Sequence, residues 1–127
     1  MPSQDYLFQV AEAISTGATC PRASVGAILV DKDTKRILAT GYNGAASGEP
    51  HCVDVGCKME DGHCQSAIHA ELNVIAQAAK YGASVNNTEM YIVIKSNNPT
   101  TDILRPCREC WKAMRAAGIV NYQIKSI

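Results

Sequence analysis

The chain reads HAE at residues 69–71 and PCREC at residues 106–110, and these two segments decide how the rest of the sequence is interpreted. They supply one imidazole and two thiolates, a set that suits Zn²⁺ and leaves a fourth tetrahedral position for water. His69, Cys107 and Cys110 are therefore the predicted ligands of a catalytic zinc ion. Glu71 follows the histidine closely enough to move the proton of that water, so we predict a proton shuttle and not a ligand.

Each segment alone has a weaker meaning. A Cys-x-x-Cys pair at 107–110 is as typical of a redox pair or of half a zinc knuckle as it is of a catalytic site, and HAE by itself indicates still less. Taken together, with a helix expected at both places, the two segments favour a catalytic metal site over these alternatives.

Composition limits the classes of protein to consider. With 127 residues, of which 46% are hydrophobic, the chain is long enough for one compact domain, residues 1–127, and too short for two. Twelve basic and twelve acidic side chains give no net charge to attract a polyanion, which argues against a nucleic-acid substrate. Residues 1–5 have no signal-peptide character and no stretch is long enough to span a bilayer, so we expect a cytoplasmic protein without membrane partners.

The remaining cysteines and histidines form a second group of candidate ligands. Without a signal peptide, metal ligation is a better interpretation of six cysteines than a disulfide framework. Four of these residues would hold a second, structural zinc that closes the irregular segment before residue 65: Cys20, His51, Cys52, Cys57, His63 and Cys64. Small buried cysteines with loop histidines, or reversible disulfides, are the alternatives, and the sequence does not choose the four ligands.

The first third of the chain predicts a helix followed by a β-hairpin. Ser3 is a suitable N-cap and Gly17 a suitable stop. The apolar residues between them recur at the spacing of one helical face: Leu7, Val10, Ala11 and Ile14. The apolar run 25–30, the polar turn 31–35 and the run 37–40 then predict two strands joined as a hairpin.

The second half predicts a helix, a strand, a helix and a last strand. The first of these helices is expected from about Ser66 to Gly82, with an inward face made of Leu72, Ile75, Ala76 and Ala79. A buried strand at 90–94, a helix at 107–117 and a strand at 119–124 follow. A strand, helix, strand order implies a parallel pair of strands.

Both parts of the metal site are expected in first helical turns. Cys107 and Cys110 are three residues apart on one helix face, where the positive end of the helix dipole favours thiolate over thiol. An ideal helix places residues two apart on roughly opposite sides. His69 and Glu71 therefore converge only if they lie at a helix terminus.

The chain resembles the deoxycytidylate branch, bacterial and bacteriophage in type, of the zinc-dependent cytidine and deoxycytidylate deaminase family. The motifs that carry the resemblance are GYNGAASG at 41–48, DGHC at 61–64 and the HAE and PCREC segments, and the similarity runs from about residue 20 to 120. It implies an α/β fold of three α-β-α layers, with a mixed sheet of four to five strands flanked by helices. It also implies hydrolysis of dCMP to dUMP and ammonia by hydroxide on zinc, in a homo-hexamer activated by dCTP and inhibited by dTTP with Mg²⁺.

The resemblance also implies roles for other residues. Asn43 matches the asparagine that holds the sugar, and the backbone near Ala70 is expected to help position the substrate. The region associated with the allosteric nucleotide is matched by Gly41, Tyr42, Asn43, Gly44 and Gly48, for which an ordinary glycine turn is the alternative. Arg22 and Ser24 are the candidate phosphate contacts.

Family members generally continue past the region of 119–124 with another helix and strand, while this sequence ends at Ile127. We therefore expect the contacts with the substrate phosphate to differ.

Three other functions compete with dCMP deamination. A cytidine deaminase acting on the free nucleoside would need no contacts with a phosphate. A tRNA adenosine deaminase is disfavoured by the lack of a basic surplus. A non-catalytic, nucleotide-binding zinc module is disfavoured by Glu71, because a structural zinc does not use an uncoordinated carboxylate.

Overall fold

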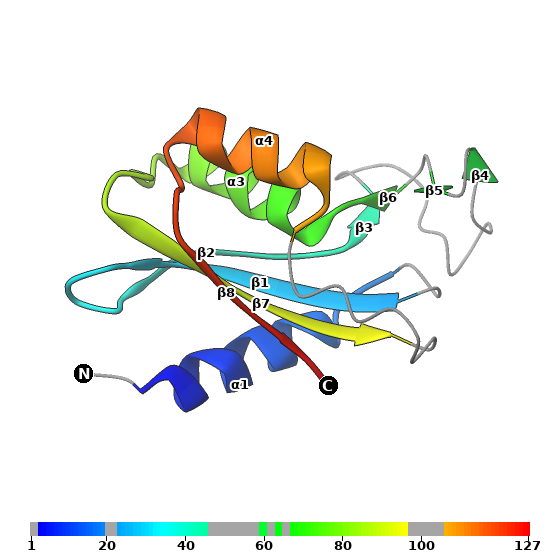
Figure 1. Ribbon diagram of the computed structural model, residues 1–127, viewed down its shortest axis with the longest axis horizontal. Coiled ribbons are helices and arrows are strands. Elements are labelled where there is room, and N and C mark those ends of the chain that lie inside the picture. The colour runs from blue at the N-terminus through cyan, green and yellow to red at the C-terminus, as the bar shows by residue number, and fades with distance from the viewer. Residues whose placement is uncertain (1–2, 20–22, 46–58, 61–62, 65–66, 97–105) are drawn as a thin grey trace.

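The computed structural model describes residues 3–19, 23–45, 59–60, 63–64, 67–96 and 106–127. These residues form three layers, with one helix below a mixed sheet and two helices above it (Figure 1). The helices are α1 (Gln4–Ser15), α3 (Ala70–Tyr81) and α4 (Arg108–Ala117). The sheet contains β1 (Ala23–Asp31), β2 (Ile37–Tyr42), β7 (Thr88–Ser96) and β8 (Tyr122–Ser126). The predicted three-layer α/β fold is confirmed.

The four strands have the order β2-β1-β7-β8. β1 pairs antiparallel with β2 and with β7, whereas β7 and β8 pair in parallel across the connection that contains α4. The predicted hairpin and the predicted parallel pair are both confirmed. Two short antiparallel pairs lie outside this sheet: β3 (Gly44–Ala45) with β6 (Ala67–Ile68), and β4 (Met59–Glu60) with β5 (His63–Cys64).

The core lies on both faces of the two central strands. Because successive side chains of a strand point to opposite faces, the apolar runs of β1 and β7 contribute to two clusters at once. The cluster below α3 and α4 contains Ala27, Leu29, Met90 and Ile92. The cluster above α1 contains Ile28, Val30, Tyr91 and Val93, together with Leu7 and Ala11 of the helix. The sheet is therefore a rigid support for the helices on either side.

α1 begins and packs as the sequence predicts. The hydroxyl of Ser3 accepts a hydrogen bond from the backbone N–H of Tyr6 at 3.2 Å, as an N-cap residue does. On the sheet side, a Cβ at Gly26 would overlap the carbonyl oxygen of Ala11. Glycine in β1 thus lets the backbones of helix and strand touch.

Two predictions about α3 are wrong. The helix begins at Ala70 and not near Ser66, because residues 67–68 form β6 and pair with β3. Its buried face contains Ala70, Val74 and Ala78. Of the predicted inward residues, Ile75 packs against the same core, whereas Leu72 is half-buried and Ala76 and Ala79 are exposed. Alanine carries too little apolar surface to mark a helix face, so the periodicity of this alanine-rich segment was ambiguous.

The last strand also begins later than predicted. β8 starts at Tyr122, because the chain after α4 first closes the helix end. Gly118 has a φ of 96°, and its N–H and that of Ile119 donate to the carbonyls of Arg115 and Met114. Ile119 is fully buried where it closes the end of α4. An apolar residue at this place in the sequence is equally typical of a strand, so the sequence did not show where β8 begins.

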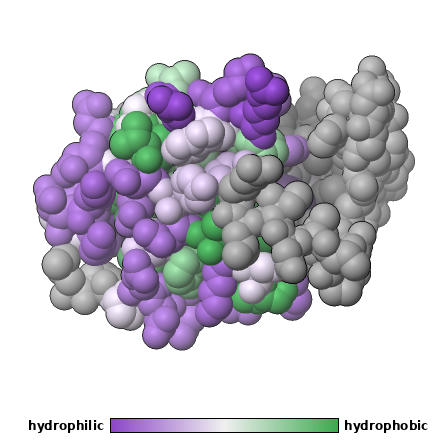
Figure 2. All heavy atoms as spheres, in the orientation of Figure 1, coloured by the Kyte–Doolittle hydropathy of each residue, from purple (hydrophilic) through white to green (hydrophobic). Residues whose placement is uncertain are grey.

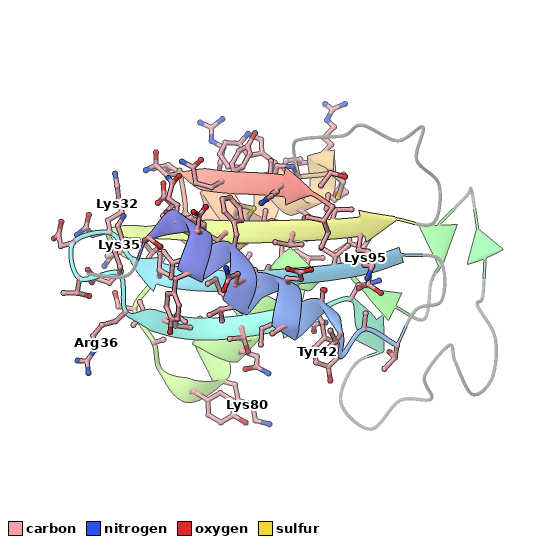
Figure 3. All side chains as sticks on the ribbon, turned by 90° about the horizontal axis from the view of Figure 1, so that it is seen from below. Lys32, Lys35, Arg36, Tyr42, Lys80 and Lys95 are labelled. Carbon is pink, nitrogen blue, oxygen red and sulfur yellow. The ribbon has the colours of Figure 1, made fainter. Side chains whose placement is uncertain are left out.

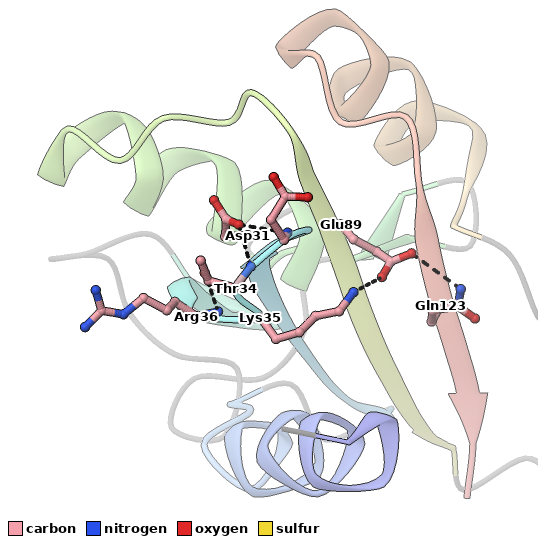
Figure 4. A network of polar contacts seen from close by, with 7 residues as sticks. Asp31, Thr34, Lys35, Arg36, Glu89 and Gln123 are labelled. Carbon is pink, nitrogen blue, oxygen red and sulfur yellow. Dashed lines mark hydrogen bonds and ion pairs between the residues drawn. The ribbon is translucent and has the colours of Figure 1, made fainter. Parts of the chain in front are cut away.

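Polar contacts fix the hairpin end of the sheet (Figure 4). Glu89 at the start of β7 is 3.7 Å from the Nζ of Lys35 and accepts from the Nε2 of Gln123 at 3.5 Å. Asp31 accepts from the backbone N–H groups of Asp33 and Thr34, both at 2.9 Å. Figure 3 shows Lys32, Lys35 and Arg36 at this end, with Tyr42 and Lys95 toward the opposite one.

The surface of the described residues is mainly hydrophilic on the face shown in Figure 2. In Figure 2 apolar side chains form small separate patches among hydrophilic ones on the face that it displays. None of the described helices is long and apolar enough to cross a bilayer.

Candidate metal centre

His69 lies immediately before α3, and this position brings it together with Glu71. The backbone of His69 is extended, with φ of −63° and ψ of 149°, so it is the N-cap and not a helical residue. Glu71 is the second residue of the helix and is 6% exposed. Because His69 lies before the helix, the angular offset between residues of a regular helix does not separate these two side chains. Both reach Cys110, since Nδ1 of His69 is 3.1 Å from its sulfur and the Glu71 carboxylate hydrogen-bonds with the same thiol.

α4 supplies the two cysteines in the same way. Cys107 is the N-cap of the helix, and its sulfur accepts a hydrogen bond from the N–H of Cys110 at 3.4 Å. Cys110 lies in the first turn and is fully buried. The helix thus begins at Arg108, one residue later than predicted, and both sulfurs point toward the start of α3.

The three predicted ligands meet at one point. The Nδ1 atom of His69 is 3.1 Å from the sulfur of Cys110 and 3.3 Å from that of Cys107, and the three ligand atoms lie within 4.8 Å of one another. Tetrahedral zinc with ordinary bond lengths holds a nitrogen and a sulfur ligand about 3.6 Å apart. One nitrogen and two sulfurs also exclude Mg²⁺ and Ca²⁺, which prefer oxygen ligands. The residues therefore fit a zinc ion bound through Nδ1 of the histidine.

The surroundings of Cys110 act against ionisation of its thiol when no cation is present. Burial raises the pKa of the Cys110 thiol, and the neighbouring Glu71 carboxylate, which also hydrogen-bonds with it, raises the pKa further. Desolvation and this negative charge oppose the positive end of the helix dipole, and the predicted thiolate stays a prediction. A divalent cation between the ligands supplies the positive charge that a thiolate at this place requires.

Asn43 is held firmly beside the end of β2. Its side-chain oxygen accepts from the backbone N–H of Val25 at 2.8 Å, and its own N–H donates to the Val25 carbonyl at 3.3 Å. Its carbonyl accepts from the N–H of Thr19 at 3.1 Å. These contacts fix the direction of the amide, as a residue that orients a ligand requires.

The other predicted site residues have varied positions. Ala70, the first residue of α3, has a fully buried side chain, so any contact that it makes with a ligand is through its backbone. Ser24 is half-buried on β1, where the next residues of its face, Gly26 and Ile28, contact α1 and not the helices of the metal centre. Arg22 and Gly48 lie outside the described residues.

The predicted second zinc is not described by the structure. Cys20, His51, Cys52 and Cys57 lie outside the described residues. For His63 and Cys64 the structure describes the backbone, which forms β5. The second site therefore stays a prediction. Across the described ranges, the group of His, Cys and carboxylate side chains able to hold a metal is the one formed by His69, Cys107 and Cys110.

Sequence reasoning missed Asn73. Its side chain leaves α3 and donates through Nδ2 to the carbonyl of Tyr42 at 2.7 Å. The signal that was available is an asparagine, a weak helix former, one turn beyond His69 in an otherwise helix-favouring segment.

Comparison with known proteins agrees with this geometry. The fold and the centre are those of a zinc-dependent deaminase, and residues 1–126 match the family model of the cytidine and deoxycytidylate deaminase zinc-binding region. The chain belongs to this family.

Individual relatives have sequence identities of 26–40% to this chain. ComE operon protein 2 of Bacillus subtilis is 40% identical over 114 residues, an alignment that covers 90% of the chain and 54% of that protein, so the chain spans about half its length. The deoxycytidylate deaminase of Enterobacteria phage T4 is 26% identical over 89% of the chain and 72% of the phage protein. The dCMP deaminase from cyanophage S-TIM5, whose crystal structure was solved in complex with dCMP and dUMP, has 30% sequence identity to this chain. It superimposes with a TM-score of 0.75 over 97% of this chain and 80% of that one.

Proposed function

We propose that the protein deaminates dCMP, converting it with water to dUMP and ammonia, a step that supplies thymidylate synthesis. The observation that carries this proposal is the meeting of His69, Cys107 and Cys110 with the buried Glu71 beside them. The similarity to phage enzymes named deoxycytidylate deaminase, and to a structure solved with dCMP and dUMP, supports the choice of substrate.

The chain's own residues divide the work of this reaction. Zinc, when bound, lowers the pKa of a water molecule and so supplies a nucleophile near neutral pH. Glu71 would accept the proton of that water and donate it to N3 of cytosine. It would then accept the proton of the hydroxyl group added at C4 and deliver it to the amino group, which leaves as ammonia as the C4 carbonyl forms. Its burial beside Cys110 restricts the carboxylate to the space next to the ligands and shields these transfers from bulk water.

The remaining roles belong to the same proposal. Asn43 holds the sugar, with its amide directed by the contact with Val25. Arg22 is the candidate phosphate contact that we retain, because Ser24 shares the face of β1 that packs on α1, and the second zinc is held by four of the six candidate ligands. Control by dCTP and dTTP with Mg²⁺ through the region 41–48, assembly as a hexamer and a cytoplasmic location complete it.

The experiment that tests the function combines metal analysis with turnover. Purified protein is assayed for zinc per chain and for ammonia release from dCMP and from deoxycytidine, with and without dCTP or dTTP. We expect zinc to be bound, dCMP to be preferred, dCTP to activate and dTTP to inhibit. Equal turnover of deoxycytidine would favour a nucleoside deaminase, and nucleotide binding without ammonia release would favour a non-catalytic module. Two zinc ions per chain would support the second site, and one would remove it.

A further inference from the structure

Asn73 joins the catalytic helix to the end of an edge strand. Its side-chain Nδ2 donates to the carbonyl of Tyr42, the last residue of β2, at 2.7 Å. Its backbone N–H donates to the carbonyl of His69 at 3.0 Å. A single residue thus contacts the backbone of a zinc ligand on one side and the end of the sheet on the other.

The neighbouring Gly41 shows how closely the two elements approach. A Cβ at Gly41 would lie 2.7 Å from the carbonyl oxygen of Ala70 and 2.7 Å from the nitrogen of Val74. Cβ atoms are essentially never found at such distances. The first turn of α3 therefore rests on the backbone of β2, with no side chain between them to adjust the spacing.

The same end of β2 leads to Asn43. The residue after Tyr42 is Asn43, which is fixed to Val25 of β1 through its side-chain oxygen and its backbone N–H. We call Gly41, Tyr42, Asn43 and Asn73 the β2–α3 corner. It forms a short connected path of close contacts from Asn43 to the helix turn that begins at His69.

The residue type indicates that the amide serves the contact with β2. Asparagine is a weak helix former, and its amide tends to compete with the hydrogen bonds of its own helix. Here the side chain makes a short hydrogen bond to another element and satisfies an edge-strand carbonyl. Alanine at this position would suit the helix better, so helix formation does not explain the choice.

We infer that Asn73 is a positioning residue, which sets the first turn of α3, with His69 and Glu71, in place relative to Asn43. This inference rests on the proposed function for its catalytic consequence, because Asn43 holds the sugar and Glu71 serves the base of one nucleotide. A displacement of about 1 Å between such groups lowers a rate by about 100-fold. The corner therefore keeps the two ends of the substrate site at a fixed separation.

The test compares Asn73→Ala with Gln77→Ala. Gln77 is an exposed amide one turn further along the same helix, so it is a matched control. For Asn73→Ala we expect kcat for dCMP per bound zinc to fall about tenfold to 100-fold, with thermal stability retained because alanine favours the helix. Gln77→Ala keeps the parental kcat. Asn73→Gln keeps an amide donor on a longer arm and recovers part of the loss. A kcat per zinc for Asn73→Ala equal to that of Gln77→Ala overturns the inference.

A second measurement does not depend on the reaction. Hydrogen exchange of the backbone amides of residues 73 and 74, whose acceptors are the carbonyls of His69 and Ala70, reports whether the first turn is held. We expect about tenfold faster exchange in Asn73→Ala than in Gln77→Ala, because the turn loses its hydrogen bond to the Tyr42 carbonyl at the end of β2. If no variant and no parental protein deaminates dCMP, the proposed function fails while this difference still supports the positioning role. Unchanged exchange overturns it in either case.

Discussion

The three described helices begin with different kinds of N-cap residue. α1 begins after Ser3, whose hydroxyl accepts from the N–H of Tyr6 at 3.2 Å. α4 begins after Cys107, whose sulfur makes a longer contact of 3.4 Å with the N–H of Cys110. α3 begins after His69, which makes no side-chain capping hydrogen bond. Both helices that meet at the candidate metal centre thus begin with a candidate metal ligand, and neither of these residues caps its helix as closely as Ser3 caps α1.

This difference indicates that the residues before α3 and α4 are better suited to binding a metal than to capping a helix. Serine, threonine, aspartate and asparagine at the N-cap stabilise a helix by about 1 kcal/mol relative to residues that do not cap. A position just before a helix is nevertheless well suited to a ligand, because its backbone is extended and its side chain is free of the helical repeat. A metal ion bound by these residues would join the starts of the two helices and would supply stability that weak capping does not.

The largest expected effect comes from the carboxylate between these helix starts. Glu71→Gln keeps the volume of the buried side chain and removes the proton shuttle, so turnover of dCMP should fall by about 1,000-fold. Glu71→Ala should be similarly inactive. Zinc per chain should not change, because Glu71 is not a ligand. Steady-state kinetics with metal analysis measures both.

The matched control for this prediction is Glu109→Gln. Glu109 also lies in the first turn of a helix, but it is exposed and pairs with Lys112 at 3.8 Å on the surface. Its variant should keep parental turnover. Substantial dCMP turnover by Glu71→Gln would show that another group moves the protons.

The second prediction converts a ligand cap into an ordinary one. Loss of a residue that only supports a metal ligand typically weakens metal binding by about 10- to 100-fold. Cys107→Ser replaces a candidate ligand itself, so it should weaken zinc binding by more than that. In the presence of a chelator, the same change should raise the free energy of unfolding by about 0.5–1 kcal/mol, because serine is the better N-cap. Competition with a chromophoric chelator and denaturant unfolding measure the two effects. If Cys107→Ser lowers both the zinc affinity and the free energy of unfolding without metal, or raises both, the comparison of the helix starts is wrong.

The third prediction applies to the helix that has no metal. Ser3→Ala should lower the free energy of unfolding by about 1 kcal/mol through loss of the cap, while zinc binding and turnover stay unchanged. Gln9→Ala, at an exposed position of the same helix, is the control and should not destabilise the protein. Loss of turnover in Ser3→Ala, with the fold intact, would contradict the separation between the two kinds of helix start.

The smallest effect is expected at the hairpin turn, where Asp31 caps backbone N–H groups as Ser3 does. The hydrogen bonds from Thr34 and Asp33 lower the pKa of the Asp31 carboxyl below its ordinary 3.8. Its contribution to stability is therefore complete above pH 3.8 and is lost as the pH falls through the lowered value. Asp31→Asn, which still accepts hydrogen bonds, should show a smaller loss of stability over this acid range. Unfolding curves at a series of pH values measure the difference.

The sequence predicted the order of the elements better than their ends. The hairpin, the parallel pair of β7 and β8, and the helix after Ser3 follow from local periodicity and turn chemistry. The start of α3 and the start of β8 do not, since β6 pairs with a distant segment and Ile119 is used to close α4. These boundaries depend on contacts that no window of neighbouring residues contains.

For the metal centre, the sequence by itself identified the candidate ligands, because one imidazole and two thiolates at helix starts have few other uses together. Tertiary structure decided how they work. It placed His69 outside α3 so that it meets Cys107 and Cys110, it raised the pKa of Cys110 by burial beside Glu71, and it joined Asn73 to Tyr42. Ligand identity is a property of side-chain chemistry, whereas convergence, burial and spacing arise only when distant segments pack against one another.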